Sequence, residues 1–174
     1  PLGLSGSRGV IRADGEAEFI AAFERIRTLL NAPEMLRHRD PALGFIQVEE
    51  YIPGREFALE GLVTQGRLQT LAIFDKPDPL DGPFFEETIY LTPSRQPPAV
   101  QLSMQQAIQQ AGGALGLWHG PVHAELRAND RGIWVLETAA RPIGGLCAQV
   151  LRFEDGLSLE AAILQHALGH DTTG

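Results

Sequence analysis

One hairpin-forming segment constrains the fold of this chain more than any other feature: residues 121–145, PVHAELRANDRGIWVLETAARPIGG. Apolar and polar residues alternate on both sides of a turn-forming stretch, which is the pattern of a half-buried antiparallel pair. Gly132 can adopt the left-handed conformation that a three-residue turn favours, so the turn is predicted at residues 130–132. In that register Glu125 lies directly opposite Glu137.

The two faces of this predicted hairpin differ in chemistry. The even-numbered face is apolar and is predicted to lie in the core: Val122, Ala124, Leu126, Trp134 and Leu136. The odd-numbered face is ionic: His123, Glu125, Arg127, Glu137 and, beyond the strand end, Arg141. Like charges directly opposite one another destabilise a sheet, so the glutamate pair requires a cation.

Two kinds of cation could neutralise the glutamate pair, and spacing alone does not choose between them. Arg127 and Arg141 could pair with the carboxylates on a solvated face. Alternatively, a magnesium ion could lie between the carboxylates, because Mg²⁺ prefers a few carboxylates together with nucleotide phosphates to an all-protein cage. The hairpin therefore predicts either structural ion pairs or a metal site.

The rest of the chain predicts an α+β fold in which antiparallel strands are joined by short turns. A glycine-rich segment, SGSRGV, is predicted to join two short strands in a hairpin over residues 1–12. A helix is predicted from an N-cap at Asp14 to a stop at Pro33, with an apolar stripe of Phe19, Ile20, Phe23, Ile26, Leu29 and Leu30. The other predicted elements are strands at 44–52, 55–65, 67–76, 84–91, 119–128 and 133–139, a helix at 97–117 and two short C-terminal helices.

Composition disfavours several classes of protein. The net charge of −8 disfavours nonspecific binding to nucleic acid. The single cysteine, Cys147, excludes an internal disulfide and is typical of a reducing compartment, so a cytoplasmic location is expected. No apolar run approaches the roughly 20 residues that span a bilayer, so no membrane partner is expected. Lys76 is the only lysine among 14 basic residues, which marks it as a candidate for a role that arginine cannot fill.

Four motifs, in order along the chain, resemble the ATP-grasp enzymes. More narrowly, they are similar to the carboxylate–amine ligases related to L-amino-acid ligases, carbamoyl-phosphate synthase and biotin carboxylase. The motifs are SGSRGV, VEEYIPGREF, FDK and HAELR…LETAARPIGG, and together they cover nearly the whole chain. The resemblance implies an ATP-grasp fold of the α+β class, with antiparallel sheets flanked by helices and a glycine-loop hairpin at the N-terminus.

The resemblance also implies roles for the matching residues. The loop that would close over the ATP phosphates comprises Ser5, Gly6, Ser7, Arg8 and Gly9. The hinge strand whose backbone would pair with adenine comprises Glu49, Glu50, Tyr51 and Ile52. Glu56 would accept hydrogen bonds from the ribose, and Glu125 and Glu137 would hold Mg²⁺, with Mn²⁺ as a substitute. Arg141 would contact the γ-phosphate or an acyl phosphate, and Lys76 is expected to contact phosphate or the acyl substrate.

The implied activity is ATP-dependent ligation, in which a carboxylate is activated as an acyl phosphate and an amine then displaces phosphate. The family's phosphate-binding lysine should directly precede residue 1, so the chain is expected to be the C-terminal part of a longer enzyme and inactive by itself. Residues 1–174 would form one ATP-grasp domain. Within it, residues 1–48 would complete the glycine-loop subdomain and residues 49–174 would form the C-terminal ATP- and magnesium-binding subdomain. Ala139 replaces the asparagine of many members, which reduces the ligands expected for a second metal ion.

Two other functions stay open on this sequence. One is a non-catalytic nucleotide-binding module that another domain or chain completes. The other is an acidic α+β interaction domain that binds no nucleotide. The partners expected for the leading hypothesis are ATP, a carboxylate, an amine and the missing N-terminal part of the same enzyme, with a homodimer as an open alternative.

Overall fold

The computed structural model describes residues 4, 6–37, 39–85, 89–153 and 156–170 of the chain. The chain divides into two compact units. Unit 1 comprises Pro1–Pro53 and Asp78–Thr88, and unit 2 comprises Gly54–Pro77 and Ile89–Gly174. In the described part of the chain, no helix has the length and apolar content needed to cross a membrane.

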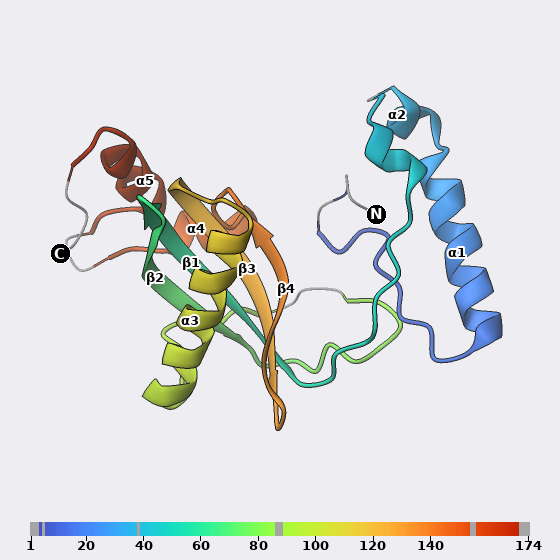
Figure 1. The fold of residues 1–174 in the computed structure, drawn as a ribbon, viewed down its shortest axis with the longest axis horizontal. Helices are drawn as coiled ribbons and strands as arrows, with labels where there is room; N and C mark the ends of the chain where they lie inside the picture. Colours follow the sequence, from blue (N-terminus) through green and yellow to red (C-terminus); the bar gives the residue numbers. More distant parts are fainter. Residues whose placement is uncertain (1–3, 5, 38, 86–88, 154–155, 171–174) are drawn as a thin grey trace. The chain divides into compact units, whose positions relative to one another are not determined.

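Unit 2 is built on a four-stranded antiparallel sheet with the strand order β2-β1-β3-β4 (Figure 1). The strands are β1 (Arg55–Thr64), β2 (Arg67–Lys76), β3 (His119–Asn129) and β4 (Gly132–Ala139). The strands predicted at 55–65, 67–76, 119–128 and 133–139 are therefore confirmed, and with them the α+β class. The interior of β1 is buried throughout, because this strand lies between two others and is covered on both faces.

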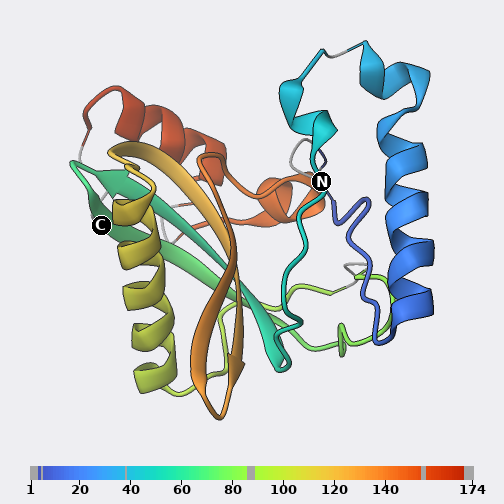
Figure 2. The same ribbon diagram turned by 45° about the vertical axis from the view of Figure 1, so that its right-hand side comes forward.

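Each face of this sheet has its own apolar core, because successive side chains of β1 alternate between the faces. The core toward α3 (Pro98–Ala114) comprises Phe57, Leu59, Ile73, Met104, Ile108, Ala124 and Leu126. The other face packs on α4 (Gly145–Val150), α5 (Leu159–Ala167) and the segment between them (Figure 2). Its buried residues are Ala58, Phe74, Ile143, Leu151 and Leu159. Glu56 and Glu60 share this second face with Ala58, since all three are even-numbered positions of β1.

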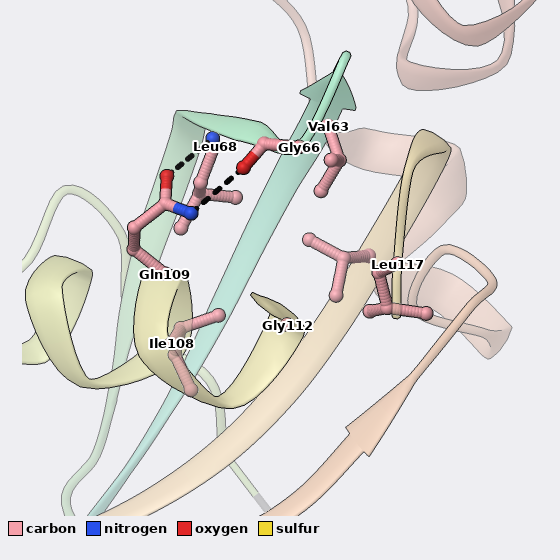
Figure 3. Close-up of a pocket in the computed structure, with 8 residues that line it drawn as sticks. Val63, Gly66, Leu68, Ile108, Gln109, Gly112 and Leu117 are labelled. Atoms are coloured by element: carbon pink, nitrogen blue, oxygen red, sulfur yellow. Dashed lines mark hydrogen bonds between the residues drawn. The ribbon is translucent and has the colours of Figure 1, made fainter. Parts of the chain in front are cut away.

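One amide side chain ties α3 to the β1–β2 turn (Figure 3). Gln109 Nε2 donates to the carbonyl oxygen of Gly66 at 2.8 Å, and Gln109 Oε1 accepts from the N–H of Leu68 at 2.8 Å. Between this contact and Gly112 lies a void of about 10 Å³, at the lower limit of the space that one water molecule needs. Most of its lining is apolar, so the void is a small packing defect and not a ligand site.

The β3–β4 hairpin confirms the predicted pairing of Glu125 with Glu137 but reaches it by a different route. Asn129 pairs with Gly132, so the turn has two residues and the three-residue turn predicted at 130–132 is wrong. A register shift next to Glu125 then inserts Leu136 as an extra residue of β4. The shorter turn and the extra residue compensate, and the two glutamates face each other.

The two-residue turn also corrects the predicted core face of β4. Ile133 and Val135 pack against the core on the α3 side, whereas Leu136 is exposed and Trp134 lies opposite Arg127. The prediction that Trp134 and Leu136 belong to the core is therefore wrong, because it assumed one register along the whole hairpin. On β3 the prediction is confirmed by the burial of Val122, Ala124 and Leu126.

Unit 1 contains the helices α1 (Glu16–Leu30) and α2 (Pro33–Leu36) and the 3-10 helix η1 (Pro41–Gly44). Pro33 begins α2 in addition to ending the preceding helical pattern, since proline is well tolerated in a first helical turn. Of the predicted apolar stripe on α1, Ile26 and Leu30 are buried. Three other residues of the predicted stripe, Phe19, Ile20 and Phe23, are exposed.

The N-cap of α1 is Gly15 and not Asp14 as predicted. Arg12 Nε donates to the Asp14 carboxylate at 2.8 Å, so that carboxylate is engaged outside the helix. The N–H of Asp14 donates in turn to Glu18 Oε2 at 2.8 Å. Asp14 therefore stabilises the approach to the helix instead of capping its first N–H groups.

Two predicted strands are not formed by the described residues. Residues 45–53 carry no strand pairing, so the strand predicted at 44–52 is wrong. In the stretch predicted as a strand at 84–91, Phe84 bridges Ile11 and Leu91 bridges Asp75, each as an isolated pair. Residues 86–88 lie outside the described part. In the predicted N-terminal hairpin, residues 6–9 form a turn, and residues 1–3 and 5 also lie outside the described part.

Candidate functional site

Charged side chains collect on the sheet face opposite α3, because the register of three strands brings them side by side. Glu56 of β1 pairs with Lys76 of β2 and with Arg127 of β3. Further along β1, Glu60 pairs with His123. Directly opposed residues of an antiparallel sheet share a face, so these side chains lie together with Glu125. We define the ionic cluster as Glu56, Glu60, Lys76, His123, Glu125 and Arg127.

Lys76 is the centre of one half of the ionic cluster. Its Nζ donates to Glu56 Oε1 at 2.9 Å and to Glu125 Oε1 at 3.0 Å. Arg127 Nε donates to the other oxygen of Glu56, Oε2, at 2.9 Å. Glu56, Lys76 and Arg127 are buried. Two carboxylates balance two cations here, the condition under which buried charges are tolerated.

The pKa of Lys76 is raised above its usual value. Burial alone would lower it, because burial disfavours the charged ammonium, but the nearby carboxylates of Glu125 and Glu56 outweigh burial. Lys76 is therefore a permanent cation in this fold. It can stabilise negative charge, but it cannot act as a proton acceptor at neutral pH.

Glu60 and His123 form the other half of the ionic cluster. Glu60 is 1% exposed and His123 is 5% exposed. His123 Nδ1 donates to Glu60 Oε1, and Glu60 Oε2 accepts from the backbone N–H of Ile143 at 3.0 Å. The other ring nitrogen, Nε2, lies 3.7 Å from Glu125 Oε1. Burial disfavours the imidazolium, but Glu125 and Glu60 outweigh burial and raise the pKa of His123 to about 9.

Glu137 and Arg141 lie at the exposed rim beside the ionic cluster. Glu137 is paired with Glu125 across the β3–β4 ladder, and its side chain is 57% exposed. Arg141 Nη2 lies 3.6 Å from Glu137 Oε1, and Arg141 Nη1 donates to the carbonyl oxygen of Pro142 at 3.1 Å. An exposed ion pair of this kind adds only about 0–1 kcal/mol of stability, so little opposes its rearrangement around a ligand.

The Glu125–Glu137 pair fits a magnesium ion that is shared with phosphates. Among the described residues, no group of three or more His, Cys, Asp or Glu side chains is arranged to hold a metal by itself. Two opposed carboxylates are, however, the donor set that Mg²⁺ takes when phosphate and water oxygens complete its octahedron. Of the two arginines expected to neutralise the pair, Arg141 contacts Glu137, whereas Arg127 donates to Glu56.

The glycine-rich loop predicted to bind phosphate belongs to unit 1. Its residues 6–9 form a turn, and φ is positive at Gly6, Ser7 and Gly9. Glycine adopts this conformation at little steric cost, so the sequence suits the turn. Arg8 is exposed, and Ser5 lies outside the described residues.

The predicted adenine-binding residues also belong to unit 1, on an extended segment without strand pairing. Glu49 and Glu50 are exposed, and Ile52 is half-buried. The guanidinium of Arg12 lies 3.9 Å from the centroid of the Tyr51 ring, and the Phe85 ring stacks on Tyr51 at 6.5 Å between centroids. Five of the predicted site residues therefore belong to unit 2: Glu56, Lys76, Glu125, Glu137 and Arg141. The predicted phosphate-binding loop and the predicted adenine-binding residues belong to unit 1.

Glu60 was not predicted from the sequence. His123 was placed only on the ionic face, and Arg127 only as an ion-pair partner of Glu125 and Glu137. A signal for Glu60 was present, because a carboxylate inside the apolar run FALEGLV is rarely buried without a partner. Its spacing from Glu56 also puts both on one face of a strand. The partner of Glu60 lies on another strand far along the chain, so only the sheet register identifies it.

Comparison with known proteins identifies the relatives of this chain. A family model described as an ATP-grasp domain matches residues 1–150. An L-amino acid ligase from Bacillus licheniformis is 28% identical and aligns over 91% of this chain with a TM-score of 0.74. The alignment covers 38% of the ligase, so the chain spans well under half of that protein.

Two further solved structures share the fold at 15% identity. Phosphoribosylglycinamide synthetase from Anaerococcus prevotii has a TM-score of 0.56, with 91% of this chain and 37% of the synthetase covered. Biotin carboxylase from Campylobacter jejuni has a TM-score of 0.55, with 72% of this chain and 28% of the carboxylase covered. The comparison with curated proteins returned no match.

Proposed function

The chain belongs to the ATP-grasp domain family, and we propose that it supplies the ATP-binding, carboxylate-activating part of an ATP-dependent carboxylate–amine ligase. Related proteins that carry this domain are ATP-dependent ligases. The observation that carries the proposal is the Glu125–Glu137 pair at the rim of an ionic cluster that contains Lys76. This arrangement concentrates carboxylates for a metal and cations for phosphate at one place on the sheet.

The residues at the rim would receive the phosphates of ATP. Glu125 and Glu137 would hold magnesium, which when bound supplies positive charge to the phosphate oxygens. Arg141 has a fixed fork of donors and is exposed, so it would bind the γ-phosphate and the acyl phosphate formed from it. Lys76 would present its permanent charge to phosphate or to the acyl substrate.

The proposed reaction has two steps. The carboxylate oxygen of the acyl substrate bonds to the γ-phosphorus as the bond to the β,γ-bridging oxygen breaks, and ADP leaves. The amine nitrogen then attacks the acyl carbon and loses a proton as phosphate leaves. Two anions must meet in the first step, so Lys76 and Arg141 would act mainly by neutralising charge and aligning the reactants.

We assign the remaining ATP contacts on the family resemblance. Residues 5–9 would cover the phosphates, and residues 49–52 would pair with adenine. Glu56 would accept from the ribose hydroxyls, because a carboxylate has about four acceptor positions and its bonds to Lys76 and Arg127 use two of them. Residues 1–48 would complete the glycine-loop subdomain, and residues 49–174 would form the C-terminal subdomain.

Thermal unfolding with Mg²⁺ and a non-hydrolysable ATP analogue tests the metal pair. We expect the complex to raise the Tm of the wild type, since a ligand at 100 times its Kd adds about 2.7 kcal/mol of stability. Glu137→Gln should lose the magnesium-dependent part of this gain. Without ligand its stability should stay within about 0.5 kcal/mol of the wild type, because Glu137 is exposed.

Glu160→Gln is the matched control, because Glu160 is an exposed glutamate on α5. This variant should keep the full magnesium-dependent gain. A wild type whose Tm is indifferent to the magnesium–nucleotide complex would overturn the proposed function. A Glu137→Gln variant that keeps the whole gain would remove Glu137 from the site.

A second candidate function is a nucleotide-binding module without catalysis. The observation that favours it is the engagement of Lys76, whose ammonium is held by the carboxylates of Glu56 and Glu125. Such a module would gain stability from the magnesium–nucleotide complex in the same way. The two functions therefore differ in turnover and not in binding.

A further inference from the structure

We propose that Glu60 is a positioning residue, which orients the carboxylate of Glu125 through His123 and fixes the loop that carries Arg141 through the backbone of Ile143. The inference rests on the proposed function, because it concerns how the same site is kept ready for a magnesium–nucleotide complex. It adds to that function a buried residue that would contact neither metal nor nucleotide.

The carboxylate of Glu60 directs its two oxygens to two different elements. Oε1 accepts from His123 Nδ1 on β3, and Oε2 accepts at 3.0 Å from the N–H of Ile143, which lies between β4 and α4. Glu60 is 1% exposed, so water hardly competes for these bonds. One side chain of β1 therefore restrains both elements that lead to the rim.

His123 transmits this restraint to Glu125. Its Nδ1 is held by Glu60, which sets the orientation of the ring, and Nε2 then lies 3.7 Å from Glu125 Oε1. Lys76 Nζ donates to the same oxygen at 3.0 Å. One carboxylate oxygen of Glu125 thus lies between the Lys76 ammonium and the His123 ring, which restrains the orientation of the carboxylate.

Ile143 transmits the restraint to the loop. Its side chain is buried in the core with Ala58 and Leu159, and its N–H is bound by Glu60. Arg141 precedes it by two positions, separated only by Pro142, whose φ is fixed by its ring. Pro142 also restricts the backbone of Arg141, because the residue before a proline favours extended conformations.

A purely stabilising role does not explain a buried pair of this kind. Replacing a buried ion pair by apolar residues is often neutral or stabilising, because desolvation offsets the attraction. In contrast, mutation of a residue that hydrogen-bonds a metal ligand and orients it typically weakens metal affinity by about 10- to 100-fold. The expected effect of Glu60 is therefore on metal affinity.

Asp75 offers a matched control in the same unit. It is 3% exposed and, like Glu60, it binds a loop N–H, that of Arg95 at 3.0 Å, together with one side chain, Ser94 Oγ at 2.6 Å. It pairs with Phe57 and so lies on the α3 side of the sheet, away from the ionic cluster. Asp75→Asn weakens a similar buried loop contact without altering the cluster.

The test is the Kd for Mn²⁺, measured by electron paramagnetic resonance with a saturating non-hydrolysable ATP analogue. The proteins compared are the wild type, Glu60→Gln, His123→Gln and Asp75→Asn, each with a melting curve that shows it to be folded. Glu60→Gln and His123→Gln should each raise the Kd at least tenfold. Asp75→Asn should lower the Tm but change the Kd less than twofold.

Each failure has a distinct meaning. A folded Glu60→Gln protein with unchanged Mn²⁺ affinity overturns the inference and leaves the proposed function intact. If Glu60→Gln does not fold, His123→Gln decides by the same comparison. An equal loss of affinity in Asp75→Asn also overturns the inference, because general loosening would then explain it. Failure of the wild type to bind Mn²⁺ with the nucleotide overturns the proposed function itself.

Discussion

Lys76 and His123 are buried cations whose charge depends on their carboxylate neighbours. For each, burial works against the charged form, and two glutamates more than compensate. Glu125 is the neighbour common to both, since it lies within 3.0 Å of Lys76 Nζ and 3.7 Å of His123 Nε2. A change at Glu125 therefore alters the charge balance of both cations at once.

His123 should make the stability of the fold depend on pH. Its pKa is raised from 6.5 to about 9, so the folded state holds the proton more tightly than the unfolded state does. The stabilisation is fully present below about pH 6.5 and is lost as the pH rises through 9. We expect the free energy of unfolding to fall by roughly 3 kcal/mol between pH 6.5 and 9.5, since one pKa unit corresponds to about 1.4 kcal/mol.

Urea unfolding of the wild type and of His123→Gln at several pH values measures this effect. Other groups titrate above pH 8, and the variant retains them, so the difference between the two proteins isolates His123. The variant should show the smaller decrease in stability. Equal decreases in both proteins would contradict a protonated His123 in the folded state.

At the scale of elements, two glycines near the end of α3 differ in whether an alanine could replace them. Gly112 lies inside α3, where an added Cβ would meet Leu117 at 3.8 Å, an ordinary contact. Gly116 follows the helix with φ +73, and the N–H of Leu117 donates back to the carbonyl oxygen of Gly112 at 2.9 Å. This is a helix-ending motif that needs a left-handed residue at position 116.

Gly112→Ala should therefore stabilise the protein. Alanine is favoured over glycine inside a helix by about 0.5–1 kcal/mol, and the neighbouring void leaves room for a methyl group. The expected rise in Tm is about 2 °C for a chain of this size. Gly116→Ala is the control with the opposite sign and should destabilise by about 1 kcal/mol, because alanine is strained at positive φ. A lower Tm for Gly112→Ala would show that the helix end cannot accept the methyl group.

At the scale of the whole molecule, the chain spans 38% of the L-amino acid ligase that it resembles. Its only lysine is Lys76, which is held between Glu56 and Glu125. Phosphoryl transfer depends on several positive groups around the phosphates. We therefore expect the cations of this chain to support the binding of ATP but not its rapid turnover.

The 174-residue chain should therefore bind Mg·ATP without sustained turnover. We expect ADP formation below about 0.01 per second, compared with roughly 1 to 1,000 per second for typical enzymes. A coupled assay for ADP with the purified chain, free of other ATPases, measures this rate. Steady ADP formation near 1 per second, dependent on a carboxylate and an amine, would show that this chain is sufficient for ligation.

The sequence by itself determined the four strands of unit 2 and the opposition of Glu125 and Glu137. Alternation over residues 121–145 predicted β3, β4 and the opposition of Glu125 and Glu137, and the four ordered motifs predicted the ATP-grasp fold. The strand predictions succeed because alternation is a local property of the chain. The Glu125–Glu137 pairing holds because the shorter turn and the extra residue Leu136 compensate. The run at 44–52 has strand-like composition but is part of no strand, so local pattern alone misassigned it.

Only the tertiary structure decided which side chains meet across strands. The two-residue turn placed Trp134 opposite Arg127, and the register of β1 against β3 placed Glu60 opposite His123. A shift of one residue moves every later side chain to the other face, and no local pattern reports such a shift. Partners far apart in sequence are brought together by packing of the whole sheet, which is why the Glu60–His123 pair became visible only in the fold.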